Sequence, residues 1–219
     1  MIRSKFEKEL SKLTIDLNKM CHLVVNAIED CVTSFKTHDK DLAAEIIVND
    51  KIINDCERSI EARCLSLLLK QTPLASDLRN VSTALKIVTD LERIGDQSAD
   101  IAAILVDIDM ALSFKMVEQI PNMASIAKKM VKESILAFSK KDIELAKEVK
   151  EYDNHMDECF ILVKQDLANI MKESPENTDA CINYLMIAKY LERIGDHAVN
   201  ICEWVEFNQS GNLNDTRLL

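Results

Sequence analysis

The stretch Leu91-Glu92-Arg93-Ile94-Gly95-Asp96 returns unchanged as Leu191-Glu192-Arg193-Ile194-Gly195-Asp196. The two copies lie 192 − 92 = 100 residues apart, which is close to half of the 219-residue chain. Self-similarity at a fixed offset is the signature of an internal repeat. The hexapeptide therefore predicts a duplicated domain, and the chain can be compared half against half.

The composition favours an all-α fold. Glycine and proline number only three each and aromatic residues make up 5% of the chain, which suits long helices and disfavours a sheet protein rich in turns. The hydrophobic content of 47% is ample for a buried core. The formal net charge of −10 disfavours nucleic acid as a partner and favours cationic partners or metal ions.

The sequence carries no targeting or membrane signal. Its N-terminal residues lack the apolar core of a signal peptide, and no apolar run approaches the roughly 18 residues of a membrane span. The seven cysteines form no C-x-x-C pair, and several fall on apolar helical stripes. We therefore expect a soluble cytoplasmic protein whose cysteines are reduced core residues.

Three amphipathic helices are expected in the first half. From Phe6 onward, apolar residues alternate steps of three and four for about 30 residues, which is the spacing of a helix with one buried face. The short polar residues at 37–39 suit the cap of a second helix, which we expect to end at residues 72–73. A third helix is expected over about 75–106.

The second half predicts the same plan. Ser113 is a candidate N-cap of a fourth helix, and residues 139–142 resemble a capping box that opens a fifth. Ser174 and Pro175 suit the cap and first residue of a sixth helix, because proline is tolerated in a first turn. We expect this last helix to end near Phe207.

The two halves can be aligned along their length. Phe35 matches Phe138 at an offset of 138 − 35 = 103 residues, so a loop three residues shorter in the second half would restore the offset of 100. The predicted fold is all-α, with six long helices in two tandem, pseudo-symmetric three-helix up-and-down bundles. The bundles are expected at residues 1–107 and 113–208, followed by a flexible C-terminal tail at 209–219.

The hexapeptide contributes to a row of oxygen-bearing side chains on each of its two helices. Positions four apart on a helix share a face. The rows are Glu92, Asp96 and Asp100 in the first half, and Glu192, Asp196 and Asn200 in the second. We expect both rows to lie on the side of the helix opposite its apolar stripe.

A second set of carboxylates lies on the second and fifth predicted helices. Asp50 is matched by Asp153 at an offset of 153 − 50 = 103 residues, and Asn54 stands where the second half has Asp157. These positions flank an apolar stripe, so their side chains could lean toward a neighbouring helix as supplementary ligands. Since the third residue of the first row is replaced by asparagine in the second half, the two sites need not bind metal equally.

Two interpretations of these rows remain open. Carboxylates are the hard oxygen ligands that divalent and trivalent cations prefer, so the rows predict metal binding. Alternatively, the rows form solvated faces, in which Arg93 and Arg193 pair with the aspartates three residues on. A glycine inside a helix costs about 1 kcal/mol relative to alanine, so Gly95 and Gly195 indicate a close neighbour, or space for a ligand or coordinated water.

No catalytic constellation is visible. The four histidines are isolated, although His197 follows Asp196 and could reach a metal in the second site. The chain has no Glu-x-x-His pair of the di-iron carboxylate proteins, no phosphate-binding glycine-rich loop and no G-x-S-x-G. We therefore name no catalytic residue and expect a protein that is not an enzyme.

The sequence resembles the PhoU family, the accessory proteins of bacterial high-affinity phosphate uptake. The duplicated hexapeptide carries the resemblance, together with Gln71-Thr72-Pro73-Leu74-Ala75-Ser76-Asp77-Leu78-Arg79 and Gly195-Asp196-His197-Ala198-Val199-Asn200-Ile201-Cys202-Glu203. It implies two three-helix bundles, a homodimer, and Glu/Asp-x-x-x-Asp motifs that hold metal. Carried over to this chain, the motifs are Glu92 with Asp96, Glu192 with Asp196, and Asp153 with Asp157. Iron or zinc would be the first candidates, followed by Mg²⁺, Mn²⁺ or Ca²⁺.

The resemblance also implies a function. PhoU-like proteins link the ATPase of the phosphate ABC transporter to a sensor histidine kinase, and they lower phosphate uptake and the phosphate-starvation response. Contact with the membrane would then be made only through those partners, and no nucleic acid would be bound. The alternatives are a metal-dependent hydrolase or redox enzyme that uses the same carboxylates, and a metal-free helical scaffold.

Overall fold

The computed structural model describes residues 2–70, 74–108, 119–213 and 216–217. These residues form the six long helices α1 (Ile2–Thr37), α2 (Lys40–Lys70), α3 (Ala75–Asp107), α4 (Gln119–Lys140), α5 (Ile143–Glu173) and α6 (Thr178–Ser210). None of the helices described here is long and apolar enough to cross a membrane. The all-α fold predicted from the repeat is confirmed.

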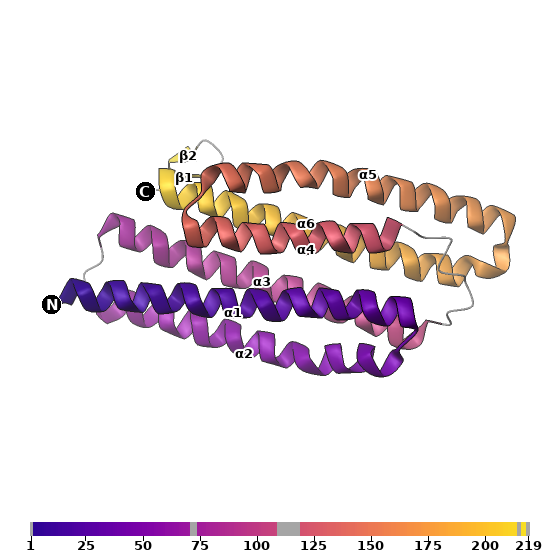
Figure 1. Ribbon diagram of the computed structural model, residues 1–219, viewed down its shortest axis with the longest axis horizontal. Coiled ribbons are helices and arrows are strands. Elements are labelled where there is room, and N and C mark those ends of the chain that lie inside the picture. The colour runs from indigo at the N-terminus through magenta and orange to yellow at the C-terminus, as the bar shows by residue number, and fades with distance from the viewer. Residues whose placement is uncertain (1, 71–73, 109–118, 214–215, 218–219) are drawn as a thin grey trace.

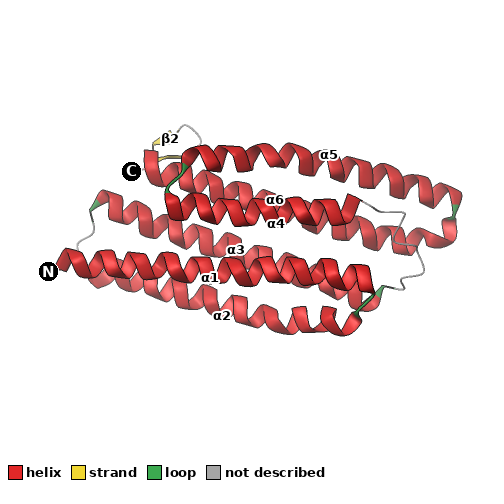
Figure 2. Cartoon of the chain, in the orientation of Figure 1, coloured by secondary structure: helices red, strands yellow, loops and turns green. Residues whose placement is uncertain are grey.

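The helices form two bundles that lie side by side (Figure 1). The first bundle is α1–α3 and the second is α4–α6, each running up and down with short connections where they are described (Figure 2). Helices α2 and α5 lie on the outer flanks, whereas α1 packs on α4 and α3 packs on α6 along the seam between the bundles. Helices α3 and α6, which carry the hexapeptides, are therefore the central pair.

The apolar stripe of each hexapeptide helix is buried, as predicted. Leu91 and Ile94 are fully buried, and so is Ile194, while Leu191 is only 2% exposed. Burying one such side chain contributes about 1.5–3 kcal/mol relative to leaving it in water. One hydrophobic core runs through both bundles, and its largest fully buried side chain, Tyr184, meets the ring of Phe35 edge-on across the seam, with ring centroids 5.5 Å apart.

The turns that open α2 and α5 are equivalent and show the duplication in the backbone. His38 and Lys141, at an offset of 141 − 38 = 103 residues, both have a positive φ, of 58° and 56° respectively. Asp39 then caps α2, as its place in the predicted cap segment suggested, because its Oδ1 accepts the N–H of Leu42 at 2.9 Å. Asp142 caps α5 in the same way, accepting the N–H of Leu145 at 3.0 Å. The predicted capping box over 139–142 is therefore wrong in detail, since its first residue still lies in α4.

The ends of α6 also differ from the sequence prediction. Residues Pro175–Asn177 form a short 3-10 helix before α6, and Ser174 makes no side-chain cap. At the other end, α6 continues to Ser210 and closes with Gly211 in a left-handed conformation at φ 75°. Two short antiparallel strands follow, β1 (Asn212–Leu213) and β2 (Thr216–Arg217), where a flexible tail was predicted. The predicted signals at Ser113 and at residues 72–73 lie outside the described residues.

The cysteines occupy the core, as predicted. All seven are free, and six of them are buried. Only Cys56, on the outer helix α2, is partly exposed. Burial raises the pKa of the Cys21, Cys31, Cys64 and Cys202 thiols to about 12, which keeps them protonated and unreactive.

The two hexapeptide glycines are expected to differ when replaced by alanine. A Cβ at Gly95 would lie 3.0 Å from Cγ2 of Ile53, whereas a Cβ at Gly195 would lie no closer than 3.5 Å to Met156. Both changes raise helix propensity by about 1 kcal/mol. Gly195→Ala should therefore raise the free energy of unfolding by up to about 1 kcal/mol, and Gly95→Ala should gain less or lose stability. Urea denaturation of both variants checks this, and an equal gain at the two positions would contradict it.

Candidate metal centre

The first carboxylate site lies in the groove between α2 and α3. Asp50 of α2 leans toward α3, so that its Oδ1 lies 3.3 Å from the position that a Cβ on Gly95 would take. Its Oδ2 accepts a hydrogen bond from Nδ2 of Asn54 at 2.8 Å. Oδ1 is buried and has no hydrogen-bond partner in the described chain. The glycine thus admits a close neighbour, Ile53, which is one of the two explanations that the sequence left open, and Asp50 lies beside it.

The row on α3 lies at the edge facing α2. Glu92 and Asp96 are half-buried, and only Asp100 is exposed. The prediction that this row lies opposite the apolar stripe was therefore wrong, because α2 packs across the glycine edge of α3 and covers the first two carboxylates. Glu57 of α2 joins them and was missed, although it falls seven residues after Asp50 on the same helical face.

Negative charge accumulates in this groove, and the positive charge of Arg93 opposes it only in part. Burial, together with the negative charges of Asp96, Glu57 and Asp50, raises the pKa of Glu92 to about 7. The pKa of Asp50 is also raised, first by burial and then by Asp96. Burial together with Asp100 raises the pKa of Asp96. A bound cation would favour the ionised form of every one of these groups.

The second site, between α5 and α6, has the same arrangement of an aspartate on the outer helix beside a glycine on the central helix. Oδ1 of Asp153 lies 3.6 Å from the position of a Cβ on Gly195. Burial raises the pKa of Asp153, and Asp157 and Asp196 raise it further. In this site, however, the ammonium of Lys189 donates a hydrogen bond to the carboxylate of Glu192. This cation was missed by the sequence analysis, although it stands three residues before its partner, a spacing that brings helical side chains together.

Lys189 gives the two sites different local charges, a difference that the exchanges between aspartate and asparagine did not predict. Position 89, the first-half equivalent of Lys189, is threonine, so the first groove has no such cation. Two aromatic contacts accompany the lysine, since both Lys189 and Lys164 lie over the ring of Phe160, at 5.5 and 4.8 Å from its centroid. Phe160 replaces Glu57, again at an offset of 103 residues (160 − 57).

Asn200 and His197 lie at the seam between the bundles. Nδ2 of Asn200 lies 3.4 Å from Oδ1 of Asp90 on α3, and Nδ1 of His197 lies 2.9 Å from the same oxygen. Asp90 is only 7% exposed. The structure therefore places both side chains against the first bundle, whereas the sequence analysis assigned Asn200 to the second metal site and noted that His197 could reach a metal there.

The solvated-face interpretation finds little support in the ion pairs. Within the described ranges, neither Arg93 nor Arg193 forms an ion pair with the aspartate three residues on. Nor do any three histidine, cysteine or carboxylate side chains of the described residues already converge as a metal-binding group. The donor set nevertheless fits a hard cation, since Asp50 leaves a buried oxygen unpaired and Asp96 and Asp100 add negative charge beside it.

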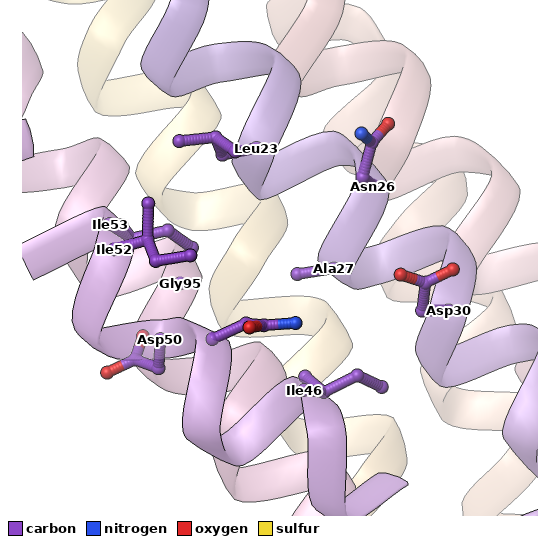
Figure 3. Close-up of a pocket in the computed structure, with 10 residues that line it drawn as sticks. Leu23, Asn26, Ala27, Asp30, Ile46, Asp50, Ile52, Ile53 and Gly95 are labelled. Carbon is purple, nitrogen blue, oxygen red and sulfur yellow. The ribbon is translucent and has the colours of Figure 1, made fainter. Parts of the chain in front are cut away.

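A cavity of about 210 Å³ opens beside the first site, between α1 and α2. Figure 3 shows it with Asn26 and Asp30 on the α1 side and Asp50 on the α2 side. The equivalent place in the second bundle is occupied by Lys129, which stands 129 − 26 = 103 residues after Asn26. Its ammonium donates to the hydroxyl of Tyr152 at 2.5 Å. The second bundle also has a cavity on this side, of about 500 Å³, and Lys129 and Tyr152 are among the residues that line it. The two cavities therefore differ in charge, since a lysine stands in the second where the first has asparagine.

Comparison with known proteins now identifies the family. The model of the PhoU domain matches residues 17–105 and again residues 120–205. The chain belongs to the PhoU family. It is 36% identical over 204 residues to the phosphate-specific transport system accessory protein PhoU homolog of Clostridium acetobutylicum, with 93% of each chain covered. A PhoU homolog 1 from Thermotoga maritima is 31% identical, covering 94% of this chain and 89% of the relative.

Solved PhoU structures share the whole architecture. The crystal structure of PhoU from Pseudomonas aeruginosa matches with a TM-score of 0.89 and 33% identity, and it covers 94% of this chain and 100% of that one. The phosphate transport system regulatory protein PhoU from Streptococcus pneumoniae matches with the same TM-score at 28% identity, covering 96% and 99% of the two chains. The resemblance drawn from the hexapeptide is therefore confirmed, and so is the tandem arrangement of two PhoU bundles.

The pH dependence of the free energy of unfolding should reveal the ionisation of Glu92 in the first carboxylate groove. In metal-free protein, folded Glu92 keeps its proton up to about pH 7, whereas the unfolded chain releases it near 4.5. The folded state binds more protons between these values, so stability falls as the pH rises through this window. Glu92→Gln should therefore be stabilised relative to wild type at about pH 8 and differ little at about pH 5.

Chemical denaturation in the presence of a chelator at the two pH values measures this difference. Glu148→Gln, an exposed carboxylate on α5, is the matched control and should leave the pH profile unchanged. A parallel pH dependence of Glu92→Gln and wild type would show that Glu92 ionises in the folded protein as it does in the unfolded chain.

Proposed function

We propose that this chain is a cytoplasmic, non-enzymatic regulator of phosphate uptake that acts as a metal-binding adaptor. In this role it would link the ATPase of a phosphate ABC transporter to a sensor histidine kinase and lower both transport and the phosphate-starvation response. The observation that carries the proposal is the match of both bundles to the PhoU domain. Relatives that cover most of the chain are named as accessory proteins of the phosphate-specific transport system, which supports the same role.

The architecture suits an adaptor. Helices of 31 residues on each flank give two long outer faces for contact with other proteins. On α2, Val48 and Ile52 stand four residues apart and are 73% and 50% exposed. Exposed apolar side chains on one helical face favour protein contact. A homodimer, as the family resemblance implies, would present two copies of each face.

The carboxylate grooves supply the metal-binding part of the proposal. In the first groove Asp50, Glu92 and Asp96 would hold the cation, with Asp100 at its exposed end. In the second groove Asp153, Asp157, Glu192 and Asp196 would do so, after Glu192 is released from Lys189. Bound cations would remove the repulsion between buried carboxylates, and they would stabilise each bundle by tying its outer helix to its central helix.

Gene deletion tests the regulatory role. In a host with an intact phosphate transporter, loss of this chain should raise expression of the uptake genes when phosphate is plentiful, because the brake on the sensor kinase is removed. Quantitative transcript measurement gives the readout, and re-expression of the chain should restore repression. Unchanged expression in the deletion strain would count decisively against the regulatory role.

Elemental analysis tests the metal. Protein purified without chelator should carry iron or zinc, and the double variant Glu192→Ala with Asp196→Ala should lose the portion held by the second groove. Glu92→Ala with Asp96→Ala should lose the portion held by the first. The control Glu144→Ala with Glu148→Ala removes two exposed carboxylates of the same spacing from α5 and should keep all metal.

Two further results separate the alternatives. Lys189→Thr installs the first-half residue and should raise the metal content or affinity of the second groove, because Glu192 loses its competing cation. Near-zero metal in wild type and in every variant would leave only the metal-free scaffold. Metal-dependent hydrolysis of a phosphoester, lost in the groove variants, would instead establish the enzyme.

A further inference from the structure

Three polar side chains that line the cavity between α1 and α2 find no partner in the described part of the chain. They are Asn26, Asp30 and Asn49, which make no hydrogen bond or ion pair there (Figure 3). A fourth, Asp50, accepts a hydrogen bond from Asn54 through Oδ2 but keeps its buried Oδ1 unpaired. No lysine, arginine or histidine is among the described residues that line the cavity. The cavity therefore has free acceptors and negative charge, but no cation of its own.

The cavity combines negative charge with an apolar floor. Burial, together with the negative charges of Glu29 and Glu45, raises the pKa of Asp30. The apolar part of the lining consists of Leu23, Ala27, Ile46, Ile52 and Ile53. A hard metal ion prefers a shell made of oxygen ligands. This lining suits an organic cation instead, whose charged end meets the carboxylates while its carbon chain lies on apolar side chains, as the stem of a lysine does.

The second bundle holds such a group at the equivalent place. Lys129 stands where the first bundle has Asn26, since 129 − 26 = 103. Its ammonium donates a hydrogen bond to the hydroxyl of Tyr152 at 2.5 Å and lies 4.1 Å from the centroid of the same ring. The hydrogen bond raises the pKa of Lys129, and the negative charges of Glu133 and Glu148 also raise it. An alkylammonium thus lies among acidic and hydroxyl groups on this side of the second bundle.

The surroundings of this ammonium have polar counterparts in the first bundle at the same offset of 103 residues. The counterparts are Asp30 for Glu133, Glu45 for Glu148 and Asn49 for Tyr152. The amide oxygen of an asparagine can accept a hydrogen bond as the phenol oxygen does. The first bundle has therefore kept the acceptors and the acidic residues, and it has lost the lysine that uses them in the second.

We propose that the cavity between α1 and α2 binds a primary alkylammonium ion, supplied by a small free amine. An ammonium donates three hydrogen bonds. The carboxylate of Asp30, the amide oxygen of Asn49 and the unpaired oxygen of Asp50 are the acceptors that the cavity offers. Its volume of about 210 Å³ is below the roughly 300–1,000 Å³ of pockets for drug-sized ligands, which fits a small amine. The proposal rests on the cavity and the repeat, and it does not depend on the regulatory function.

Such an ion would do for the first bundle what Lys129 does for the second. It would neutralise acidic side chains between the first helix of the bundle and its outer helix, and it would satisfy polar groups that the chain leaves unpaired. A ligand that binds only the folded chain stabilises it increasingly as its concentration rises above its dissociation constant. The stability of the first bundle would in this way respond to the concentration of the amine.

Titration of the full chain with n-butylammonium chloride tests the proposal, because this ion is the lysine side chain without its backbone. The chain carries labelled methyl groups, a chelator removes metal, and the ionic strength is constant. The methyl resonances of Leu23, Ile46 and Ile53 should shift saturably in wild type, because these side chains line the cavity. Sodium chloride and tetramethylammonium chloride should not reproduce the shifts, since neither cation donates a hydrogen bond.

Two variants of α1 and one control decide the result. Asp30→Asn keeps the shape of the side chain and should weaken binding about tenfold by removing a charge-assisted hydrogen bond. Asn26→Lys installs the residue of the second bundle and should abolish binding, because its own ammonium takes the place of the ligand. Asn154→Lys makes the same exchange at an exposed position of α5 and should bind like wild type.

Three outcomes would overturn the proposal. The first is the absence of saturable shifts in wild type, which would leave a cavity filled with water. The second is equal affinity in wild type, Asp30→Asn and Asn26→Lys, which would place the amine elsewhere. The third is an equal response to sodium chloride, which would show that the cavity attracts any cation. Both substitutions on α1 change side chains that are at least partly exposed, so folded protein is expected for each.

Discussion

Each bundle depends on the close approach of its outer helix to the glycine of its central helix. At Gly95 the side chain of Ile53 fills the place of a missing Cβ, and Asp50 stands beside it. The contact buries an apolar residue and a carboxylate at once, so that hydrophobic packing of α2 on α3 also desolvates negative charge. Burying the isoleucine contributes about 1.5–3 kcal/mol, and the carboxylates limit the cost of their own burial by remaining protonated or by binding a cation.

The two bundles share the same arrangement of outer helix, glycine and carboxylates, but they neutralise the negative charge differently. In the second, Lys189 pairs with Glu192, and Lys129 donates a hydrogen bond to Tyr152 beside a cavity of about 500 Å³. In the first, threonine and asparagine stand at the positions of these lysines, and the cavity of about 210 Å³ has neither cation. A lysine of the chain and a bound metal ion are two alternative ways to neutralise the same buried carboxylates. The first groove is therefore the one whose electrostatics depend more on the surrounding solution.

The sequence predicted the architecture well because helical periodicity and an exact repeat are local signals. It found the buried stripe, the cap residue Asp39 and the glycines that mark close contacts. The sequence placed the row of Glu92 and Asp96 on the wrong side of the helix. Helical spacing shows which face a residue occupies, but it does not show how much of the helix surface a neighbouring helix covers. The same limit hid Lys189, since its pairing depends on a rotamer as well as on spacing.

The seam shows how far the duplication has diverged at the points where the bundles meet. Nδ1 of His197 on α6 lies 2.9 Å from Oδ1 of Asp90 on α3. Tyr190 stands at the position equivalent to Asp90, and Gln97 stands at the position equivalent to His197. Oε1 of Gln97 is buried and has no hydrogen-bond partner in the described chain, which costs free energy. A buried carboxylate is therefore hydrogen-bonded on one side of the pseudo-symmetry, whereas on the other side a buried amide oxygen is left unpaired.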